Sequence, residues 1–360
     1  MSEPRRELRI AAIGGDGIGP EVVGVTLPLV AAAAALEGVE LVVTELDWGG
    51  ERLLRTGEAM PADAVETVRA HDAVLLGAVG HADVPPDVSV WTLVLPLRKA
   101  LDLYVNLRPI RAWAGVRTPI SSADGADFVI VRENTEGEYS GMGGSVHKDT
   151  PDEIATDVAI HSRRAIERVA RYALGLARER SQLLSLVTKS NVSRHGYALW
   201  DAVVFDLAAR EFADVEIEKV YVDAMAARMI QHPRSLGVLL CSNLFGDILS
   251  DLGAPIAGGL GMAPSANISP ESGCGVYEPV HGSAPDIAGR GIANPMACIL
   301  SAALLLRDCG LGSAALALET AVGVAVQSDA GATPDLGGAA STQSAADAVR
   351  DALDADVRVA

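Results

Sequence analysis

The sequence has few basic residues. Lysine and arginine together number 29 in the 360 residues, against 47 aspartate and glutamate residues, so the formal net charge is −18. A surface that binds nucleic acid or anionic lipid needs basic residues opposite the phosphates. The charge therefore argues against nucleic acid and membranes as partners. It does not exclude a small anionic substrate, for which a few local arginines suffice.

Long apolar runs and paired cysteines are also missing. The apolar segments 22–36 and 296–306 are shorter than the roughly 20 residues of a membrane span, so we expect two buried helices. The four cysteines show no CxxC spacing, which indicates free thiols in a reducing compartment. Residues 1–10 carry charges of both signs and resemble no secretory signal. We expect a cytoplasmic protein, and its length predicts two domains.

The usual dinucleotide-binding fingerprint is absent as well. A short apolar strand at residues 9–13 leads into the glycine-rich turn 14–19 and then a helix from Glu21. The spacing GxGxxG fails because Pro20 follows the turn, although proline suits the first turn of a helix. The segment predicts a strand–turn–helix unit near a ligand, and it argues against an ordinary Rossmann dehydrogenase.

Strand and helix patterns alternate along the chain, which predicts α/β architecture. Further strand-like runs lie at 41–46, 73–76, 128–131, 183–187, 217–222 and 238–241, and helical patterns at 61–70, 156–178 and 197–212. Polar residues follow four of these strands: Arg132, Lys189, Asp223 and Asn243. Ligands of open α/β sheets collect at the carboxyl ends of strands, so we expect a binding site there.

Two acids stand close together after the strand at 238–241. Asp247 and Asp251 are four residues apart, so a helix would place both on one face. Their repulsion would be offset by a hard divalent cation such as Mg²⁺ or Mn²⁺. With Asp223 they make three candidate ligands. The alternative is a set of solvated acids in an acidic protein.

Three arginines and two proton carriers complete the candidate site. Arg98, Arg108 and Arg132 can bind carboxylates through two parallel hydrogen bonds, although each alone can equally be a surface charge. Lys189 can serve as a base where a metal and burial lower its pKa. Tyr139 is the second candidate proton carrier. The alternatives are a solvated lysine and a structural hydroxyl.

The segment 278–289 is a dense loop of turn formers and polar residues. Its plain interpretation is a surface loop. Its functional interpretation is a nucleotide clamp, with His281 against the adenine and Asp286 accepting hydrogen bonds from the ribose hydroxyls. An acid at the ribose favours NAD over NADP because it would repel a 2′-phosphate.

Taken together, these motifs resemble the β-decarboxylating dehydrogenases, a family that includes 3-isopropylmalate, isocitrate, homoisocitrate and tartrate/D-malate dehydrogenases. The resemblance covers nearly the whole chain, at residues 14–21, 97–99, 106–109, 131–139, 189–191, 243–251, 278–289 and 292–295. The runs Asn-Leu-Phe-Gly-Asp-Ile-Leu-Ser-Asp and Glu-Pro-Val-His-Gly-Ser-Ala-Pro-Asp-Ile are highly specific in combination.

The resemblance implies two α/β domains that share a twisted mixed sheet, which is not a standard Rossmann fold. Residues 1–103 and 259–360 would form a first, NAD-binding domain. Residues 104–258 would form a second domain for dimerisation, metal and substrate, with a clasp arm at about 139–150. The family works as a homodimer with shared active sites.

The resemblance also implies a mechanism. Mg²⁺ or Mn²⁺ would be held by Asp247 and Asp251 of one subunit and by Asp223 of the other, and Lys189 beside Asp223 would take the hydroxyl proton. Hydride would pass to NAD, carbon dioxide would leave, and Tyr139 would protonate the enol carbon. A role for a monovalent cation stays open.

The remaining implied roles concern binding. The three arginines would hold the carboxylates of a small dicarboxylate substrate. The cofactor residues would be Asn191, His281, Gly282, Ser283, Ala284, Pro285, Asp286, Ile287 and Asn294.

The family reads its substrate mainly with the segment before Arg98, here with Trp91, Val94 and Leu95. Isopropylmalate enzymes carry an acid where this chain has Trp91, and this tryptophan with the run 133–144 most resembles tartrate/D-malate dehydrogenases. The apolar pair keeps 3-isopropylmalate or another 3-substituted malate as the alternative. Isocitrate is disfavoured, because no serine or asparagine pair for a third carboxylate precedes Arg98. A non-catalytic regulatory paralogue is the remote alternative.

Pro96 interrupts this specificity segment. Proline costs about 3 kcal/mol inside a helix but is tolerated in the first turn. We therefore predict that the helix bearing Arg98 starts near Leu95 or is kinked there. Near the C-terminus, we expect a glycine-rich loop at 331–341 and a helix from Thr342.

Overall fold

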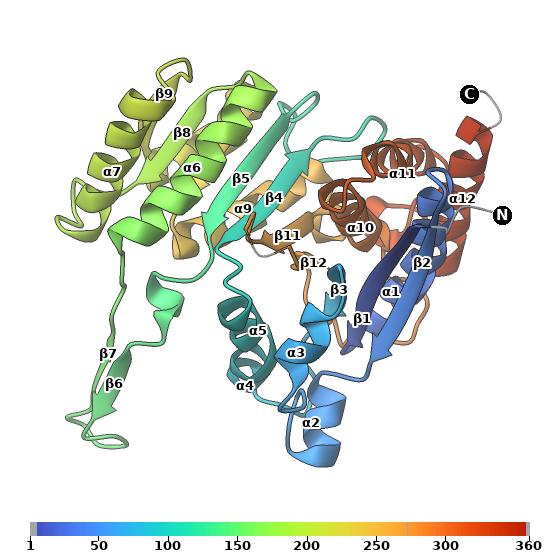
Figure 1. Ribbon diagram of the computed structural model, residues 1–360, viewed down its shortest axis with the longest axis horizontal. Helices are drawn as coiled ribbons and strands as arrows, with labels where there is room; N and C mark the ends of the chain where they lie inside the picture. Colours follow the sequence, from blue (N-terminus) through green and yellow to red (C-terminus); the bar gives the residue numbers. More distant parts are fainter. Residues whose placement is uncertain (1–5, 272, 358–360) are drawn as a thin grey trace. The chain divides into compact units, whose positions relative to one another are not determined.

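The computed structural model describes residues 6–271 and 273–357. The chain divides into two compact units, whose elements are labelled in Figure 1. Unit 1 contains Met1–Leu103, Arg111–Gly125 and Ala254–Ala360, and unit 2 contains Tyr104–Ile110 and Ala126–Gly253. The predicted domain boundaries differ from these units in two places. The prediction put residues 111–125 in the second domain, and it started the C-terminal part of the first domain at residue 259 instead of Ala254.

Unit 1 contains a mixed run of five strands in the order β2-β1-β3-β12-β11. Their bounds are β1 (Arg6–Gly15), β2 (Val39–Leu46), β3 (Ala73–Ala78), β11 (Pro264–Ile268) and β12 (Gly275–Pro279). β1 is parallel to β2 and β3, β12 is parallel to β3, and β11 is antiparallel to β12. β3 is buried along its whole length, as expected for a central strand covered on both faces.

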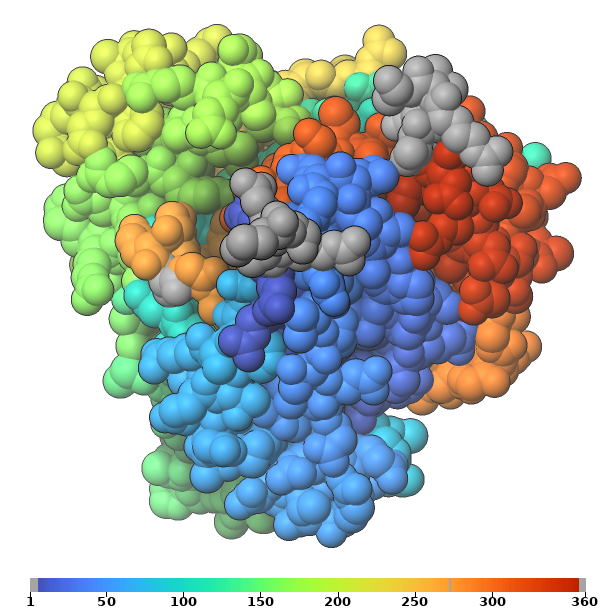
Figure 2. Space-filling view, turned by 45° about the vertical axis from the view of Figure 1, so that its right-hand side comes forward, coloured from blue at the N-terminus to red at the C-terminus, as the bar shows by residue number. Residues whose placement is uncertain are grey.

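Helices pack against one another beside these strands. Those of unit 1 are α1 (Gly19–Ala35), α2 (Gly50–Thr56), α3 (Ala64–Arg69), α4 (Pro86–Ser89), α5 (Leu95–Ala100), α10 (Met296–Asp308), α11 (Gly312–Ala325) and α12 (Thr342–Val357). α1 contacts both α10 and α12, and on the surface of the unit C-terminal residues (red) lie beside N-terminal residues (blue) in Figure 2. The buried helices expected at 22–36 and 296–306 and the helix from Thr342 are confirmed. Among the described helices, none combines the length and apolar composition that a membrane span requires.

Unit 2 contains strands in the order β4-β5-β10-β8-β9 and a separate hairpin, β6-β7. Their bounds are β4 (Val105–Arg111), β5 (Asp127–Glu133), β6 (Gly143–Val146), β7 (Ile154–Asp157), β8 (Leu184–Thr188), β9 (Ile217–Tyr221) and β10 (Val238–Cys241). Its helices are α6 (Arg163–Arg180), α7 (Gly196–Glu211), α8 (Val222–Gln231) and the start of α9 (Asn243–Ala257). The predicted mixed α/β architecture is confirmed in both units.

The helix predicted at 156–178 is wrong in its first turns. Ile154–Asp157 instead forms strand β7, which pairs with β6 in the expected arm. The helix begins only at Arg163, where the Ser162 hydroxyl accepts a hydrogen bond from the amide of Ala165 at 3.1 Å. Cross-strand pairing and this N-cap together decide where the helix starts.

The arm presents an apolar face. β6 and β7 form a hairpin that extends from the rest of unit 2 (Figure 1), and Val146 lies opposite Ile154. The amide of Val158 donates to the carbonyl of Met142, so this pair continues the ladder. Alternate residues of a strand point to one face, so the four side chains share a face, and each is about half exposed. A two-stranded hairpin is at best marginally stable alone, which makes this face a surface that gains from being covered.

The prediction for Pro96 is confirmed. α5 starts at Leu95, and Pro96 lies in its first turn. The residues before it, Val90–Val94, form a π-helical turn in which the Leu95 amide bonds to the carbonyl of Val90, five residues back. Pro96 lacks the amide that a regular α-helix would need at this point, and the wider turn accommodates the change.

Candidate functional site

The carboxyl ends of four strands lie at one edge of the sheet in unit 2. β10 is parallel to β5 and β8, and β8 is parallel to β9, so all four strands end on the same side. Arg132 is the next-to-last residue of β5, and Lys189 directly follows β8. Asp223 is the second residue of α8, which follows β9, and Asn243 is the first residue of α9, which follows β10. The sequence prediction that these polar groups gather at one edge is confirmed.

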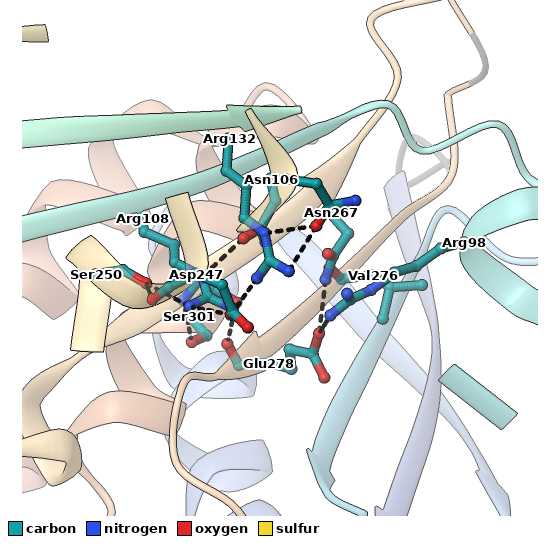
Figure 3. Close-up of polar contacts among 12 residues, drawn as sticks. Arg98, Asn106, Arg108, Arg132, Asp247, Ser250, Asn267, Val276, Glu278 and Ser301 are labelled. Carbon is teal, nitrogen blue, oxygen red and sulfur yellow. Dashed lines mark hydrogen bonds and ion pairs between the residues drawn. The ribbon is translucent and has the colours of Figure 1, made fainter. Parts of the chain in front are cut away.

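The first turns of α9 carry two carboxylates that face arginines, and Figure 3 shows one of them, Asp247, beside Arg108 and Arg132. Asp247 forms an ion pair with Arg132, and its Oδ1 lies 3.3 Å from Nη1 of Arg108. Its other oxygen, Oδ2, accepts a hydrogen bond of 2.6 Å from the Tyr139 hydroxyl. Asp251 Oδ1 lies 3.8 Å from the same Arg108 nitrogen. The structure thus brings five predicted site residues together, and the guanidinium charges offset the repulsion between the acids.

Side-chain amides and a hydroxyl anchor the two arginines. Nε of Arg108 donates to Oδ1 of Asn106 at 2.7 Å, and its Nη1 donates to the Ser250 hydroxyl at 2.5 Å. Nε of Arg132 donates to Oδ1 of Asn243 at 3.0 Å. Asn106 and Ser250 lie inside the sequence motifs but had no predicted role, and Asn243 was predicted only to lie at this edge of the sheet. For Asn106 a signal existed, since residues two apart on a strand share a face.

Burial and charge set the protonation of this cluster. Burial raises the pKa of the Tyr139 hydroxyl, and its hydrogen bond to Asp247 raises it further. The guanidinium of Arg132 also lies over the Tyr139 ring, 5.2 Å from its centroid. Burial raises the pKa of Asp251, although Arg108 opposes this shift. Tyr139 therefore keeps its proton at neutral pH.

Lys189 and Asp223 form a separate ion pair. The hydrogen bond from Lys189 lowers the pKa of Asp223, whose side chain is 68% exposed. The Lys189 ammonium lies 5.9 Å from the ring centroid of Tyr221. Within the described residues of one chain, no group of three acidic, histidine or cysteine side chains is placed to share a metal ion. Asp223 therefore does not join Asp247 and Asp251 in a single chain.

The donor chemistry of α9 nevertheless suits Mg²⁺ or Mn²⁺. Asp247 and Asp251 supply carboxylate oxygens one helical turn apart, and hard divalent cations take such ligands together with retained waters. One chain offers two of the three expected carboxylates. Asn191, expected beside the nicotinamide, lies exposed in the loop after β8.

In unit 1 the glycine-rich turn is packed against the loop at 278–289. Gly17 has φ +59°, and a Cβ there would lie 2.0 Å from the carbonyl oxygen of Ser283, so only glycine allows this approach. The Asp16 carboxylate is buried and accepts hydrogen bonds of 2.8 Å from the amides of Gly50 and Gly80. These bonds hold the loop between β1 and α1 in place beside the candidate nucleotide site.

The candidate nucleotide loop carries an unsatisfied polar atom. Nε2 of His281 is buried and makes no hydrogen bond within the described part of the chain, and burial lowers the pKa of the ring. Nδ1 lies 2.9 Å from the carbonyl oxygen of Gly282. Asn294 donates to Asp335 at 2.9 Å, a partner that the sequence did not suggest. A neutral imidazole with a spare ring nitrogen fits a polar ligand group such as a nucleotide.

The other predicted residues of this loop differ in exposure. Gly282, Pro285 and Asp286 are exposed, Ala284 and Ile287 are half-buried, and Ser283 is buried. The exposed Asp286 carboxylate is accessible to a ligand.

Arg98 and the specificity segment also lie in unit 1. Nη2 of Arg98 donates to Oε1 of Glu278 at 2.6 Å, and the amide of Asn267 donates to the same oxygen at 2.8 Å (Figure 3). Trp91 is 46% exposed, and the ammonium of Lys99 lies 5.3 Å from its ring centroid. The other two predicted specificity residues, Val94 and Leu95, are half-buried and buried.

Known proteins resemble the chain over nearly its whole length. A family model described as isocitrate/isopropylmalate dehydrogenase matches residues 9–349. A probable tartrate dehydrogenase/decarboxylase from Agrobacterium vitis is 45% identical over 353 residues, covering 97% of this chain and 98% of the relative. A 3-isopropylmalate dehydrogenase from Thermobifida fusca is 46% identical over 321 residues, covering 88% of this chain and 90% of the relative. The crystal structure of isocitrate dehydrogenase from Methylococcus capsulatus superposes with a TM-score of 0.87 at 34% identity, covering 96% and 99% of the two chains.

Proposed function

Because the chain belongs to the isocitrate/isopropylmalate dehydrogenase family, and is therefore a decarboxylating dehydrogenase, we propose that it oxidises D-malate or tartrate with NAD as the acceptor. The observation that carries the proposal is the cluster on α9, where a protonated tyrosine and two arginines surround a pair of carboxylates. The same cluster argues against a non-catalytic paralogue, which would have no need of it.

The chemistry of each side chain determines its role in the proposed reaction. The guanidinium groups of Arg108 and Arg132 bind the carboxylates of a small dicarboxylate in fixed orientation. Tyr139, with its raised pKa, gives its proton to the enol carbon after carbon dioxide has left. Lys189, as the neutral amine, takes the proton of the substrate hydroxyl, and Asp223 pairs with the ammonium that forms.

A divalent cation, when bound, would supply charge stabilisation for the oxygen atoms that become negative in the reaction. Asp247 and Asp251 would hold it, and Asp223 of a second copy of the chain would complete the set. The exposed apolar face of the arm, with Val146 and Ile154, supports a homodimer, because such a surface is stabilised by being covered. Ile248, which lies on α9 beside Asp247, is likewise 57% exposed.

NAD is proposed from unit 1. The spare nitrogen of His281 and the exposed carboxylate of Asp286 suit the adenine and the ribose. Asn294 would seat the adenosine, and Asn191 would orient the nicotinamide amide. A 2′-phosphate beside Asp286 would be repelled, which favours NAD over NADP.

The second candidate substrate is 3-isopropylmalate. It is favoured by the apolar Val94 and by the similarity to the 3-isopropylmalate dehydrogenase from Thermobifida fusca. Trp91, which stands where isopropylmalate enzymes carry an acid, supports the smaller and more polar substrates instead.

The test is NADH formation by the purified protein with Mn²⁺ and, side by side, D-malate, tartrate, 3-isopropylmalate and isocitrate. Each reaction is repeated with a chelator. A rate on D-malate or tartrate that the chelator abolishes supports the proposal. Preference for 3-isopropylmalate would move the assignment to the second candidate, and a rate that survives chelation would contradict the metal site. Lys189→Ala should abolish turnover while NAD still binds.

A further inference from the structure

Asn243 links three parts of unit 2 through one side-chain amide. It is buried, with 2% exposure, as the first residue of α9. Its Oδ1 accepts hydrogen bonds from Nε and Nη2 of Arg132, at 3.0 and 2.7 Å. Its Nδ2 donates to the carbonyl oxygen of Glu136 at 2.9 Å. The guanidinium has only hydrogen-bond donors, and the backbone carbonyl has only an acceptor. The Asn243 amide can therefore bond to both partners only when its oxygen faces Arg132 and its nitrogen faces Glu136.

A neutral residue is needed at this position. Arg132 is 2% exposed, and its Nη1 pairs with Asp247. A second carboxylate in place of Asn243 would cancel the guanidinium charge that a substrate carboxylate needs, and would repel the Glu136 carbonyl. The amide instead fixes the orientation of the guanidinium and leaves its net charge in place.

The same amide reaches the base of the arm. The Glu136 carboxylate accepts hydrogen bonds of 2.6 Å from both the amide and the hydroxyl of Ser162, where the chain returns from the hairpin to α6. The backbones of Gly137 and Ile160 also pair at this base. The segment that leaves for the arm, the segment that returns and the guanidinium of Arg132 are therefore held in one hydrogen-bonded network.

We infer that Asn243 is a positioning residue, which acts through Arg132 to hold the guanidinium where a substrate carboxylate binds. The inference rests on the proposed function, because it takes Arg132 to bind substrate. Asn243 itself touches neither substrate nor cofactor in this assignment.

The test is a double-mutant cycle on D-malate, or on whichever of the four substrates the wild-type protein turns over. Asn243→Ala in the wild-type background is expected to lower kcat/KM by roughly 10- to 100-fold, the usual effect of losing hydrogen bonds to a charged group. The loss should lie mainly in the KM of the substrate, with the KM of NAD changed less than about twofold. In an Arg132→Lys background, where the paired donors are already gone, the same change is expected to cost less than about threefold.

Ser242→Ala is the matched control. Ser242 precedes Asn243, is equally buried, and its hydroxyl lies 2.8 Å from that of Tyr197 instead of contacting an arginine. It is expected to leave the KM of the substrate unchanged. Equal losses from Asn243→Ala in both backgrounds would show a merely structural role and overturn the inference. Asn243→Ser, which keeps an oxygen acceptor, replaces the alanine variant if that variant does not fold.

A crystal structure of Asn243→Ala separates the inference from the proposed function. The Arg132 guanidinium is expected to move from its place beside Asp247 in this variant. An unmoved guanidinium would overturn the inference whatever the substrate proves to be. Absence of turnover by the wild-type protein on all four substrates would contradict the proposed function alone.

Discussion

Gly246→Ala should disable catalysis by displacing Arg132 without unfolding α9. Gly246 lies on α9, and a Cβ added there would stand 2.6 Å from both Cβ and Cγ of Arg132 and 3.2 Å from its Cδ. Carbon atoms in contact normally stand about 3.5 to 4.0 Å apart, so the side chain of Arg132 would have to move by about 1 Å. It has little room, because it is buried and anchored by Asn243 and Asp247.

Stability and activity should respond differently to this substitution. Replacing glycine by alanine inside a helix gains about 1 kcal/mol from helix propensity. Overpacking costs about 1 to 3 kcal/mol, so the free energy of unfolding should fall by no more than about 2 kcal/mol. In the proposed function Arg132 positions the substrate, and a displacement of about 1 Å in such a group can cost on the order of 100-fold in rate. We expect kcat/KM to fall by about that factor while the fold persists.

The assay pairs steady-state kinetics with denaturant unfolding, and Gly175→Ala is the matched control. Gly175 lies inside α6, and an added Cβ meets nothing within 4 Å. This variant should gain about 0.5 to 1 kcal/mol and keep its full kcat/KM. If Gly246→Ala kept wild-type kcat/KM, or if both variants lost activity equally, the reasoning from close packing on Arg132 would be refuted.

Three further predictions follow from buried or exposed groups described above. Asp16→Ala should lower the free energy of unfolding by about 3 kcal/mol, because its buried carboxylate accepts several backbone hydrogen bonds; unchanged denaturant unfolding would contradict this. Nδ1 of His161 accepts a hydrogen bond from Trp200 at 3.1 Å, and burial lowers the pKa of this histidine below its usual 6.5. Wild-type stability should therefore be fully present above pH 6.5 and fall as the pH drops through the lower folded-state value, because the unfolded state binds more protons. Thermal unfolding across this range should show a smaller slope for His161→Gln, and an equal slope would contradict the assignment. Ile154→Lys, opposite Val146 on the arm, should yield monomers of low activity in analytical ultracentrifugation, and an intact active dimer would argue against the arm as an interface.

Part of the site followed from local rules. Parallel strands end at one edge, so polar residues directly after them were expected to gather, and in unit 2 they do. The spacing of Asp247 and Asp251 needed only the period of a helix. Pro96 set the start of α5 because proline lacks the amide donor of a helix interior.

The rest depended on partners that are distant in the sequence. Asn243 and Arg132 are 111 residues apart. No local sequence pattern indicates which side chain will accept the hydrogen bond from the Nε of an arginine. The helical period of 156–178 was overridden in its first residues because β6 supplied cross-strand hydrogen bonds. Asp335, the partner of Asn294, is likewise brought close only by tertiary folding.

The π-helical turn before Pro96 changes which residues of this segment lie on the same face as Arg98. A regular α-helix brings residues seven apart back to nearly the same face, so Trp91 would lie two turns below Arg98. The turn at Val90–Val94 accommodates one additional residue, and Trp91 instead contacts Lys99, eight positions away. Positions before this turn are therefore displaced by one residue, or about 100° of rotation, from the phase relative to Arg98 that an unbroken α-helix would give them. Substitutions intended to change the substrate preference should be chosen from this shifted phase.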